Sequence, residues 1–159
     1  MRDDDALSKV KDLLRLEGGM YGTLRTMVSR EMEAIVLNSD MEELLSILQE
    51  KQEVISRLQL LTDSWGDVMS ALGFEEPRGT AAFWEKLSAL FPDEESGEFD
   101  QILSETRAAA DDLMLAEEGV QAELEKHVQR LREKMLQMKQ GRSAVIGYAK
   151  MGGGNLDLD

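Results

Sequence analysis

The only histidine of the chain, His127, is the residue whose type best suits acid–base or metal chemistry. It follows Glu123 by four positions, so on a helix the two side chains lie one turn apart and can pair or bind a metal ion. A di-iron bundle needs two Glu-x-x-His motifs, and this sequence contains none. Serine hydrolysis would need a histidine base, for which one helical histidine is weak support. We therefore expect His127 to lie at the edge of a helical seam.

Other catalytic motifs are missing from the sequence. There is no cysteine, which excludes disulfides and thiol chemistry. The glycine run 152–154 is not preceded by a predicted strand or followed by Gly-Lys-Ser/Thr, so it is not a phosphate-binding loop. Neighbouring carboxylates carry little information among 32 acidic residues. We predict that the protein is not an enzyme and has no catalytic residues, no metal site and no cofactor.

The formal net charge of −14 limits the classes of partner. A nucleic-acid-binding protein needs a basic stripe, and none is visible. An anionic membrane would repel this surface, although the acidity can also serve only to keep the protein soluble. No hydrophobic segment follows Met1 and no apolar run approaches the roughly 20 residues that span a bilayer. We expect a cytoplasmic protein that binds no nucleic acid and does not insert into a membrane.

The elements that carry these residues are predicted to be helices, because Leu, Glu, Met, Ala and Lys dominate and only two prolines occur. The first segment has apolar residues at steps of three and four, typical of one helical face. They are Leu7, Val10, Leu13, Leu14, Tyr21, Leu24, Met27, Val28, Met32, Ile35 and Val36. Gly18, Gly19 and Gly22 interrupt the pattern, which resumes in phase. We favour one long helix with a weak point, and a break there stays open.

A second helix is predicted between the turn at residues 38–40 and Gly73. Ser39 or Asp40 can cap its first turn, and Gly73 is a natural C-terminal stop. Its apolar positions are Met41, Leu44, Leu45, Leu48, Ile55, Leu58, Leu61, Trp65, Val68, Met69 and Leu72. Because the turn is so short, the first two helices should lie antiparallel.

A short helix is predicted over residues 80–91, with Thr80 as its cap. Phe83, Trp84, Leu87 and Phe91 are expected to cover one end of a bundle. Pro92 and the acidic residues 93–97 are expected to form a loop.

The last long helix is predicted to begin near Gly97 or Glu98 and to end at Gly141. Its apolar stripe consists of Phe99, Ile102, Leu103, Thr106, Ala109, Ala110, Leu113, Val120, Leu124, Val128, Leu131, Met135 and Met138. After Gly119 the helix is highly charged outside this stripe, as expected for a single apolar seam. The sequence thus predicts an all-α fold, an elongated antiparallel bundle of three long helices and one short helix. Residues 1–141 would form this domain, and residues 142–159 a flexible C-terminal tail.

Two groups of apolar residues near the C-terminus are candidates for binding another protein. Met135 and Met138 have adaptable side chains that suit a groove for partner helices, and ordinary core filling is the alternative. Val145, Ile146 and Tyr148 lie in the glycine-rich segment and can await a partner. The alternative is that they extend the last helix and dock on the bundle.

Residues 37–55 resemble the FlgN family of flagellar export chaperones. They share its pattern of a helix, a short turn containing an aspartate, and a leucine stripe followed by a lysine. Residues 141–148 are similar to the family's C-terminal region, which ends with a tyrosine and glycines. Together the resemblance covers about 100 residues.

The resemblance implies a cytoplasmic chaperone of flagellar type III secretion that binds the hook-associated proteins FlgK and FlgL. It would shield their C-terminal helices and bring them to the export gate. The implied partner-binding anchors on the last helix are Leu124, Val128, Leu131, Met135 and Met138. Tyr148, with Val145 and Ile146, would dock on the export-gate protein. The alternative is a structural coiled-coil module that forms a homodimer through the same seam.

Overall fold

The computed structural model describes residues 3–38 and 40–151, with side chains up to residue 142. This part of the chain forms four α-helices and no strand: α1 (Asp3–Val36), α2 (Met41–Leu72), α3 (Ala81–Leu90) and α4 (Asp93–Met151). The predicted all-α class is confirmed. None of these described helices has an apolar stretch of the length and hydropathy needed to cross a membrane.

The chain divides into two compact units. Unit 1 is residues 1–120 and contains α1, α2, α3 and the first part of α4; unit 2 is residues 121–159 and contains the rest of α4. The predicted domain boundary at Gly141 falls inside unit 2. That residues 142–159 act as a separate flexible tail stays a prediction.

α1 is one continuous helix, as favoured from the sequence, and Gly18 lies inside it. A Cβ atom at Gly18 would lie 3.3 Å from Oγ1 of Thr106 on α4, so the glycine permits the two helices to approach closely. Thr106 Oγ1 donates a hydrogen bond to the backbone carbonyl of Leu14 at 3.0 Å. Gly18 weakens α1 locally, but it allows the close contact between α1 and α4 that stabilises α1.

The two ends of α2 are capped as the sequence predicts. The carboxylate of Asp40 accepts a hydrogen bond from the backbone N–H of Glu42 at 3.0 Å. Ser39, the other predicted cap, lies outside the described residues. Gly73 ends the helix with φ +69°, a left-handed conformation that suits glycine, and its N–H donates to the carbonyl of Ser70.

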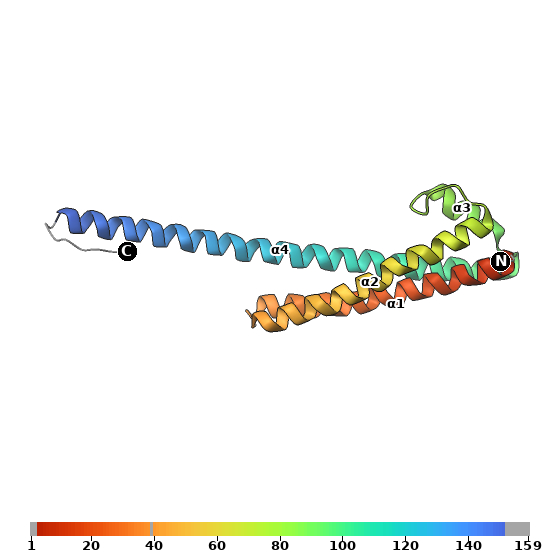
Figure 1. Cartoon of the computed structure of the whole chain (residues 1–159), viewed down its shortest axis with the longest axis horizontal. Coiled ribbons are helices and arrows are strands. Elements are labelled where there is room, and N and C mark those ends of the chain that lie inside the picture. Colours follow the sequence, from red (N-terminus) through yellow and green to blue (C-terminus); the bar gives the residue numbers. More distant parts are fainter. Residues whose placement is uncertain (1–2, 39, 152–159) are drawn as a thin grey trace. The chain divides into compact units, whose positions relative to one another are not determined.

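α1 and α2 form an antiparallel pair in unit 1, side by side in Figure 1. Arg30 forms an ion pair with Glu50 at 2.6 Å, and Glu17 accepts a hydrogen bond from the indole of Trp65. Moving toward the start of α1 thus means moving toward the end of α2. The short turn dictates this direction, as predicted.

α3 closes the end of unit 1 where α1 begins and α2 ends (Figure 1). The Thr80 hydroxyl accepts a hydrogen bond from the backbone N–H of Phe83, which confirms the predicted cap. Phe91 stacks on Phe99 of α4 with ring centroids 4.3 Å apart. Buried residues from all four helices pack together here: Leu7, Val10, Leu14, Trp65, Val68, Phe83, Leu87, Phe99 and Ile102.

Two predicted boundaries of the last helix are wrong. The acidic segment after Pro92 is not a loop but the first turn of α4, which begins at Asp93. The Pro92 carbonyl accepts the first backbone hydrogen bonds, and three acidic residues interact favourably with the positive end of the helix dipole. The helix also does not end at Gly141 but continues to Met151. One glycine costs only about 1 kcal/mol, and the residues around it are compatible with a helix.

Candidate partner-binding surface

The predicted partner-binding residues form one exposed line along the part of α4 in unit 2. They are Leu124, Val128, Leu131, Met135 and Met138, and we call this line the α4 seam. Steps of four, three, four and three place them on one face of the helix. Their exposed fractions run from 36% at Leu124 to 73% at Met138. The structure therefore gathers all five predicted anchors on one accessible apolar surface.

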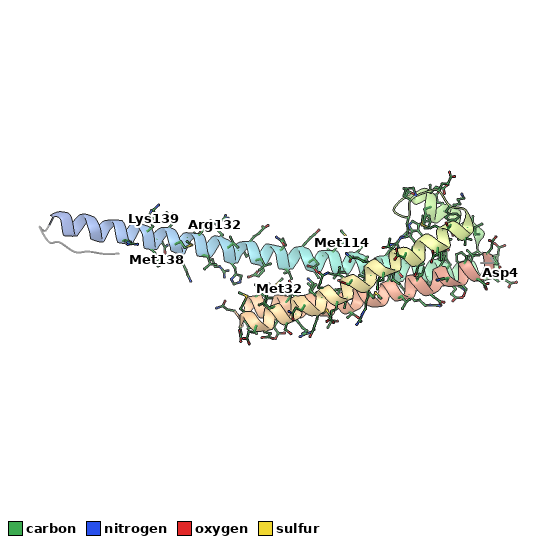
Figure 2. The ribbon with its side chains drawn as sticks, viewed as in Figure 1. Asp4, Met32, Met114, Arg132, Met138 and Lys139 are labelled. Carbon is green, nitrogen blue, oxygen red and sulfur yellow. The ribbon has the colours of Figure 1, made fainter. Side chains whose placement is uncertain are left out.

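Met135 and Met138 do not fill a core in the described structure, because they are 69% and 73% exposed. Figure 2 shows Met138 and Lys139 projecting from α4 on different sides of the ribbon. Leu136 is also 57% exposed, and the sequence analysis did not select it. Leu136 directly follows Met135 and lies beside the periodic line, so the spacing of that line does not identify it.

Basic side chains border the α4 seam. By heptad position, Arg132, Lys134 and Lys139 occupy the places on either side of the apolar line. Residues 124–138 contain four Lys or Arg against two Glu, a net charge of +2, whereas residues 1–120 contain 11 basic and 27 acidic residues, a net charge of −16. This local basic region was not predicted, because the net charge of the whole chain is strongly negative.

The predicted gate-docking residues Val145, Ile146 and Tyr148 lie within the backbone of α4. Their side chains lie outside the described residues. A continuous helix places the three residues within about one turn of each other. Their role in docking stays a prediction.

His127 lies beside the α4 seam, with its Nε2 atom 3.7 Å from Oε1 of Glu123. This distance is too long for a hydrogen bond and suits a loose ion pair when the imidazole is protonated. No group of three or more His, Asp or Glu side chains that could hold a metal ion occurs within the described ranges. The local geometry is that of a helix-surface pair four residues apart.

A second exposed apolar line, missed from the sequence, runs along the start of α2 in unit 1. Met41, Leu45 and Leu48 are 65%, 52% and 41% exposed. From the sequence they were predicted only as apolar positions of the second helix, together with residues such as Trp65 and Val68 that are buried. The buried face is formed instead by Ile47, Lys51 and Val54, which lie to one side of this line.

A buried lysine joins three helices of unit 1. Lys51 Nζ donates to Oε1 of Glu31 on α1 at 2.6 Å and to Oε1 of Glu117 on α4 at 2.7 Å. Burial disfavours the charged form of Lys51, but the hydrogen bonds to Glu117 and Glu31 and their negative charges outweigh it, so the pKa of Lys51 is raised. These contacts fix the position of α4 against the α1–α2 pair.

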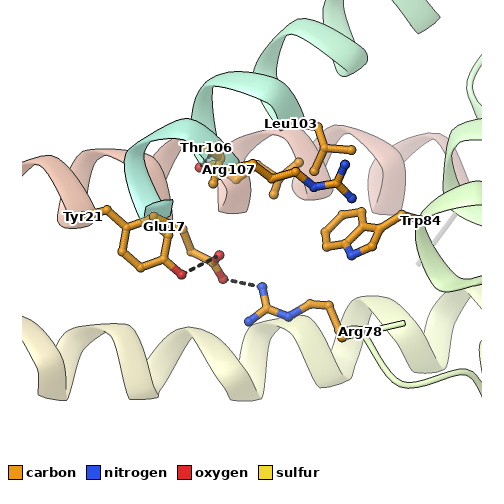
Figure 3. Close-up of a pocket in the computed structure, with 10 residues that line it drawn as sticks. Glu17, Tyr21, Arg78, Trp84, Leu103, Thr106 and Arg107 are labelled. Atoms are coloured by element: carbon orange, nitrogen blue, oxygen red, sulfur yellow. Dashed lines mark hydrogen bonds and ion pairs between the residues drawn. The ribbon is translucent and has the colours of Figure 1, made fainter. Parts of the chain in front are cut away.

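A second buried polar group, Glu17, anchors the segment between α2 and α3. Its Oε1 accepts a hydrogen bond from the indole N–H of Trp65. Oε1 also accepts from the guanidinium of Arg78, while Oε2 accepts from the Tyr21 hydroxyl at 3.4 Å (Figure 3). Burial and then the neighbouring Glu17 carboxylate raise the pKa of Tyr21. The cavity beside these groups has a volume of about 310 Å³. Because the donors of Arg78 and Trp65 bind Glu17, the cluster holds the segment between α2 and α3 in place. Among these described residues, no nucleophile is paired with a base.

Comparison with known proteins gives one result. No curated protein and no solved structure matches the chain. The family model described as FlgN protein matches residues 1–155. The chain therefore belongs to the FlgN family, a family of flagellar export chaperones that bind hook-associated proteins.

Proposed function

We propose that this protein is a cytoplasmic export chaperone that binds FlgK- and FlgL-type hook-associated proteins through the α4 seam and brings them to the export gate. The C-terminal helices of these partners would lie along the seam, which protects their apolar faces before assembly. Val145, Ile146 and Tyr148 would dock on the gate protein, because they follow the seam on the same helix.

The exposure of the whole α4 seam is the observation that supports this proposal. Five large apolar side chains on one helical face are costly to leave in water, and an amphipathic partner helix would remove them from it. Two of them are methionines, whose flexible side chains can adapt to more than one partner sequence. A chaperone for two related proteins needs such tolerance.

The test compares the affinity of two variants for the C-terminal helical region of a hook-associated protein. Leu131→Asp places a charge in the middle of the α4 seam, whereas Leu48→Asp places the same charge on α2. We expect Leu131→Asp to weaken binding by at least about tenfold, measured by calorimetry, and Leu48→Asp to weaken it far less. Circular dichroism checks that both are equally folded. Equal affinities of the two folded variants would exclude the α4 seam as the binding surface.

The second candidate is a structural coiled-coil module in which the α4 seams of two chains pair with each other. The heptad spacing of the seam favours it. The bordering charges oppose it, because Arg132, Lys134 and Lys139 of one chain would approach the same cations of the other. Light scattering of Leu131→Asp beside the unmodified protein tests this module, which requires a dimer that only α4 substitutions disrupt.

A further inference from the structure

A groove with a cationic rim lies between α3 and the first part of α4, within unit 1. Its larger hollow has a volume of about 560 Å³. The residues that line this hollow include Ala81, Trp84, Glu85, Ala89, Leu103 and Arg107. The cavity of about 310 Å³ beside Glu17 is lined by three of the same residues, Trp84, Leu103 and Arg107. We call the two hollows together the α3–α4 groove.

The guanidinium of Arg107 forms no ion pair with a carboxylate in the part of the chain that the structure describes. It lies instead over the ring of Trp84, with Cζ 5.5 Å from the ring centroid (Figure 3). Arg107 is exposed and Trp84 is half-buried. Residues 1–120 contain 27 acidic residues against 11 basic ones, so an arginine without a carboxylate partner is unusual here. Arg107 is therefore available to bind an anionic group from another molecule.

The smaller hollow is the more cationic of the two. It is lined by Arg78 and Arg107, and its one carboxylate, Glu17, is buried and bound to Arg78, which leaves a net charge of +1. Only Nη1 of Arg78 makes this contact, and its side chain is 33% exposed, so other N–H donors of this guanidinium remain for a ligand. In the larger hollow, the exposed carboxylate of Glu85 balances Arg107. A negative group is therefore favoured at the Arg107 rim, toward the smaller hollow.

The length of the groove suits a short extended peptide. Ala81 and Ala89 line the larger hollow from α3 and lie eight residues apart, or about 12 Å along the helix. An extended chain advances about 3.3 Å per residue, so about four residues cover this length. Successive side chains of such a chain point to opposite sides. An acidic residue between two apolar residues can therefore present its carboxylate to Arg107 while its neighbours cover Leu103 and the ring of Trp84.

We propose that the α3–α4 groove binds a short extended segment of a partner protein in which an acidic residue lies between two apolar residues. Arg107 binds the carboxylate, and the apolar walls of the two hollows receive the neighbouring side chains. A polyanion such as nucleic acid is disfavoured, because residues 1–120 carry a net charge of −16 and would repel it. One carboxylate is opposed far less and meets two guanidinium groups. This binding requires neither the α4 seam nor a hook-associated protein.

The test uses the full chain and the peptide acetyl-Leu-Asp-Leu-amide at millimolar concentration, followed by two-dimensional NMR. The indole N–H signal of Trp84 should shift on addition of the peptide. Arg107→Gln should weaken binding about fivefold, as expected for the loss of one exposed ion pair. Arg57→Gln is the matched control, because Arg57 is an exposed arginine on α2 that lines neither hollow. Added salt should weaken binding to the unmodified protein, because Arg107 is exposed.

A second variant changes the shape of the groove and leaves its charges intact. Ala89→Leu fills part of the larger hollow, and leucine is compatible with the exposed helical position of Ala89. It should weaken binding of the peptide although Arg107 is unchanged. Circular dichroism checks that all variants are equally helical. The peptide acetyl-Leu-Asn-Leu-amide, which has no charge, should bind about fivefold more weakly than the acidic peptide.

Three results would overturn the proposal. The first is a Trp84 indole signal that does not move at millimolar concentrations of the acidic peptide. The second is equal affinity of the folded Arg107→Gln and Arg57→Gln variants, since this would exclude Arg107 as the carboxylate-binding residue. The third is equal affinity of the unmodified protein for the acidic and the uncharged peptide, which would mean that the groove does not recognise a carboxylate.

Discussion

Lys51 Nζ on α2 lies 2.7 Å from Oε1 of Glu117 on α4, across 66 positions of sequence. The same ammonium group lies 2.6 Å from Oε1 of Glu31 on α1. One cation thus joins all three long helices of unit 1. The Glu31 side chain is 6% exposed, so its charge has little water to stabilise it if the lysine is removed.

Lys51→Met is expected to lower the free energy of unfolding by about 2–3 kcal/mol. Methionine preserves most of the apolar stem but leaves the Glu31 carboxylate buried and unpaired. The measurement is urea unfolding followed by circular dichroism. Glu117→Gln is the control and should cost about 1 kcal/mol or less, because its side chain is 43% exposed. A Lys51→Met variant as stable as the unmodified protein would mean that the three-helix contact contributes little.

Stability should fall in the alkaline range through two groups whose pKa is raised on folding. The ordinary pKa values of Tyr21 and Lys51 are 10.0 and 10.5. A group with a raised pKa binds its proton more tightly in the folded chain than in the unfolded chain. Its contribution to the free energy of unfolding is therefore complete below the ordinary pKa and is lost as the pH rises through the pKa of the folded state. Urea unfolding between pH 8 and pH 11 measures the loss. The double variant Tyr21→Phe and Lys51→Met should show a shallower decline, and an unchanged decline would contradict this assignment.

The Glu17 cluster should be needed to order the segment between α2 and α3. Glu17→Leu removes the acceptor of the Trp65 indole and leaves the guanidinium of Arg78 without its carboxylate. The expected cost is about 1–3 kcal/mol in the free energy of unfolding. Trp65 fluorescence should shift as the environment of the indole changes. Glu17→Gln has nearly the same volume and retains an acceptor for the indole, so it should cost less; equal losses would show that the negative charge of the carboxylate, rather than an acceptor for the indole, is what the cluster requires.

Periodicity and capping residues allowed most of the fold to be predicted from the sequence. Steps of three and four located α1 and α2, and Asp40 and Gly73 located the ends of α2 because their side-chain and backbone preferences act locally. The start of α4 was missed because acidic residues after a proline suit both a loop and a helix N-terminus. The continuation through Gly141 was missed because a glycine stops a helix only where the backbone turns left-handed.

The sites were predictable to a lesser extent, because exposure depends on which helices pack together. The α4 seam was predicted as a periodic apolar line. Whether that line is exposed depends on which helices pack against it, and the sequence alone does not show this. Met41, Leu45 and Leu48 on α2 follow the same kind of pattern, yet the sequence did not distinguish these exposed residues from the buried apolar positions of the same helix. The contacts of Lys51 and Glu17 join residues far apart in sequence, and no local pattern in one sequence identifies such pairs.

Removing residues 141–159 should leave unit 1 folded while it weakens binding to the export-gate protein. The core of unit 1 ends at Val120, so the deletion removes no buried side chain of that unit. The deleted part of α4 carries Tyr148 and its two apolar neighbours, which are the proposed docking residues. Thermal unfolding should give an unchanged midpoint, and circular dichroism should lose only the signal of the deleted turns. Surface plasmon resonance against the gate protein should show weaker binding, and Tyr148→Ala in the full chain should reproduce this loss. Unchanged affinity of both variants would place the docking residues elsewhere, whereas a large loss of helix would show that the C-terminal segment stabilises unit 1.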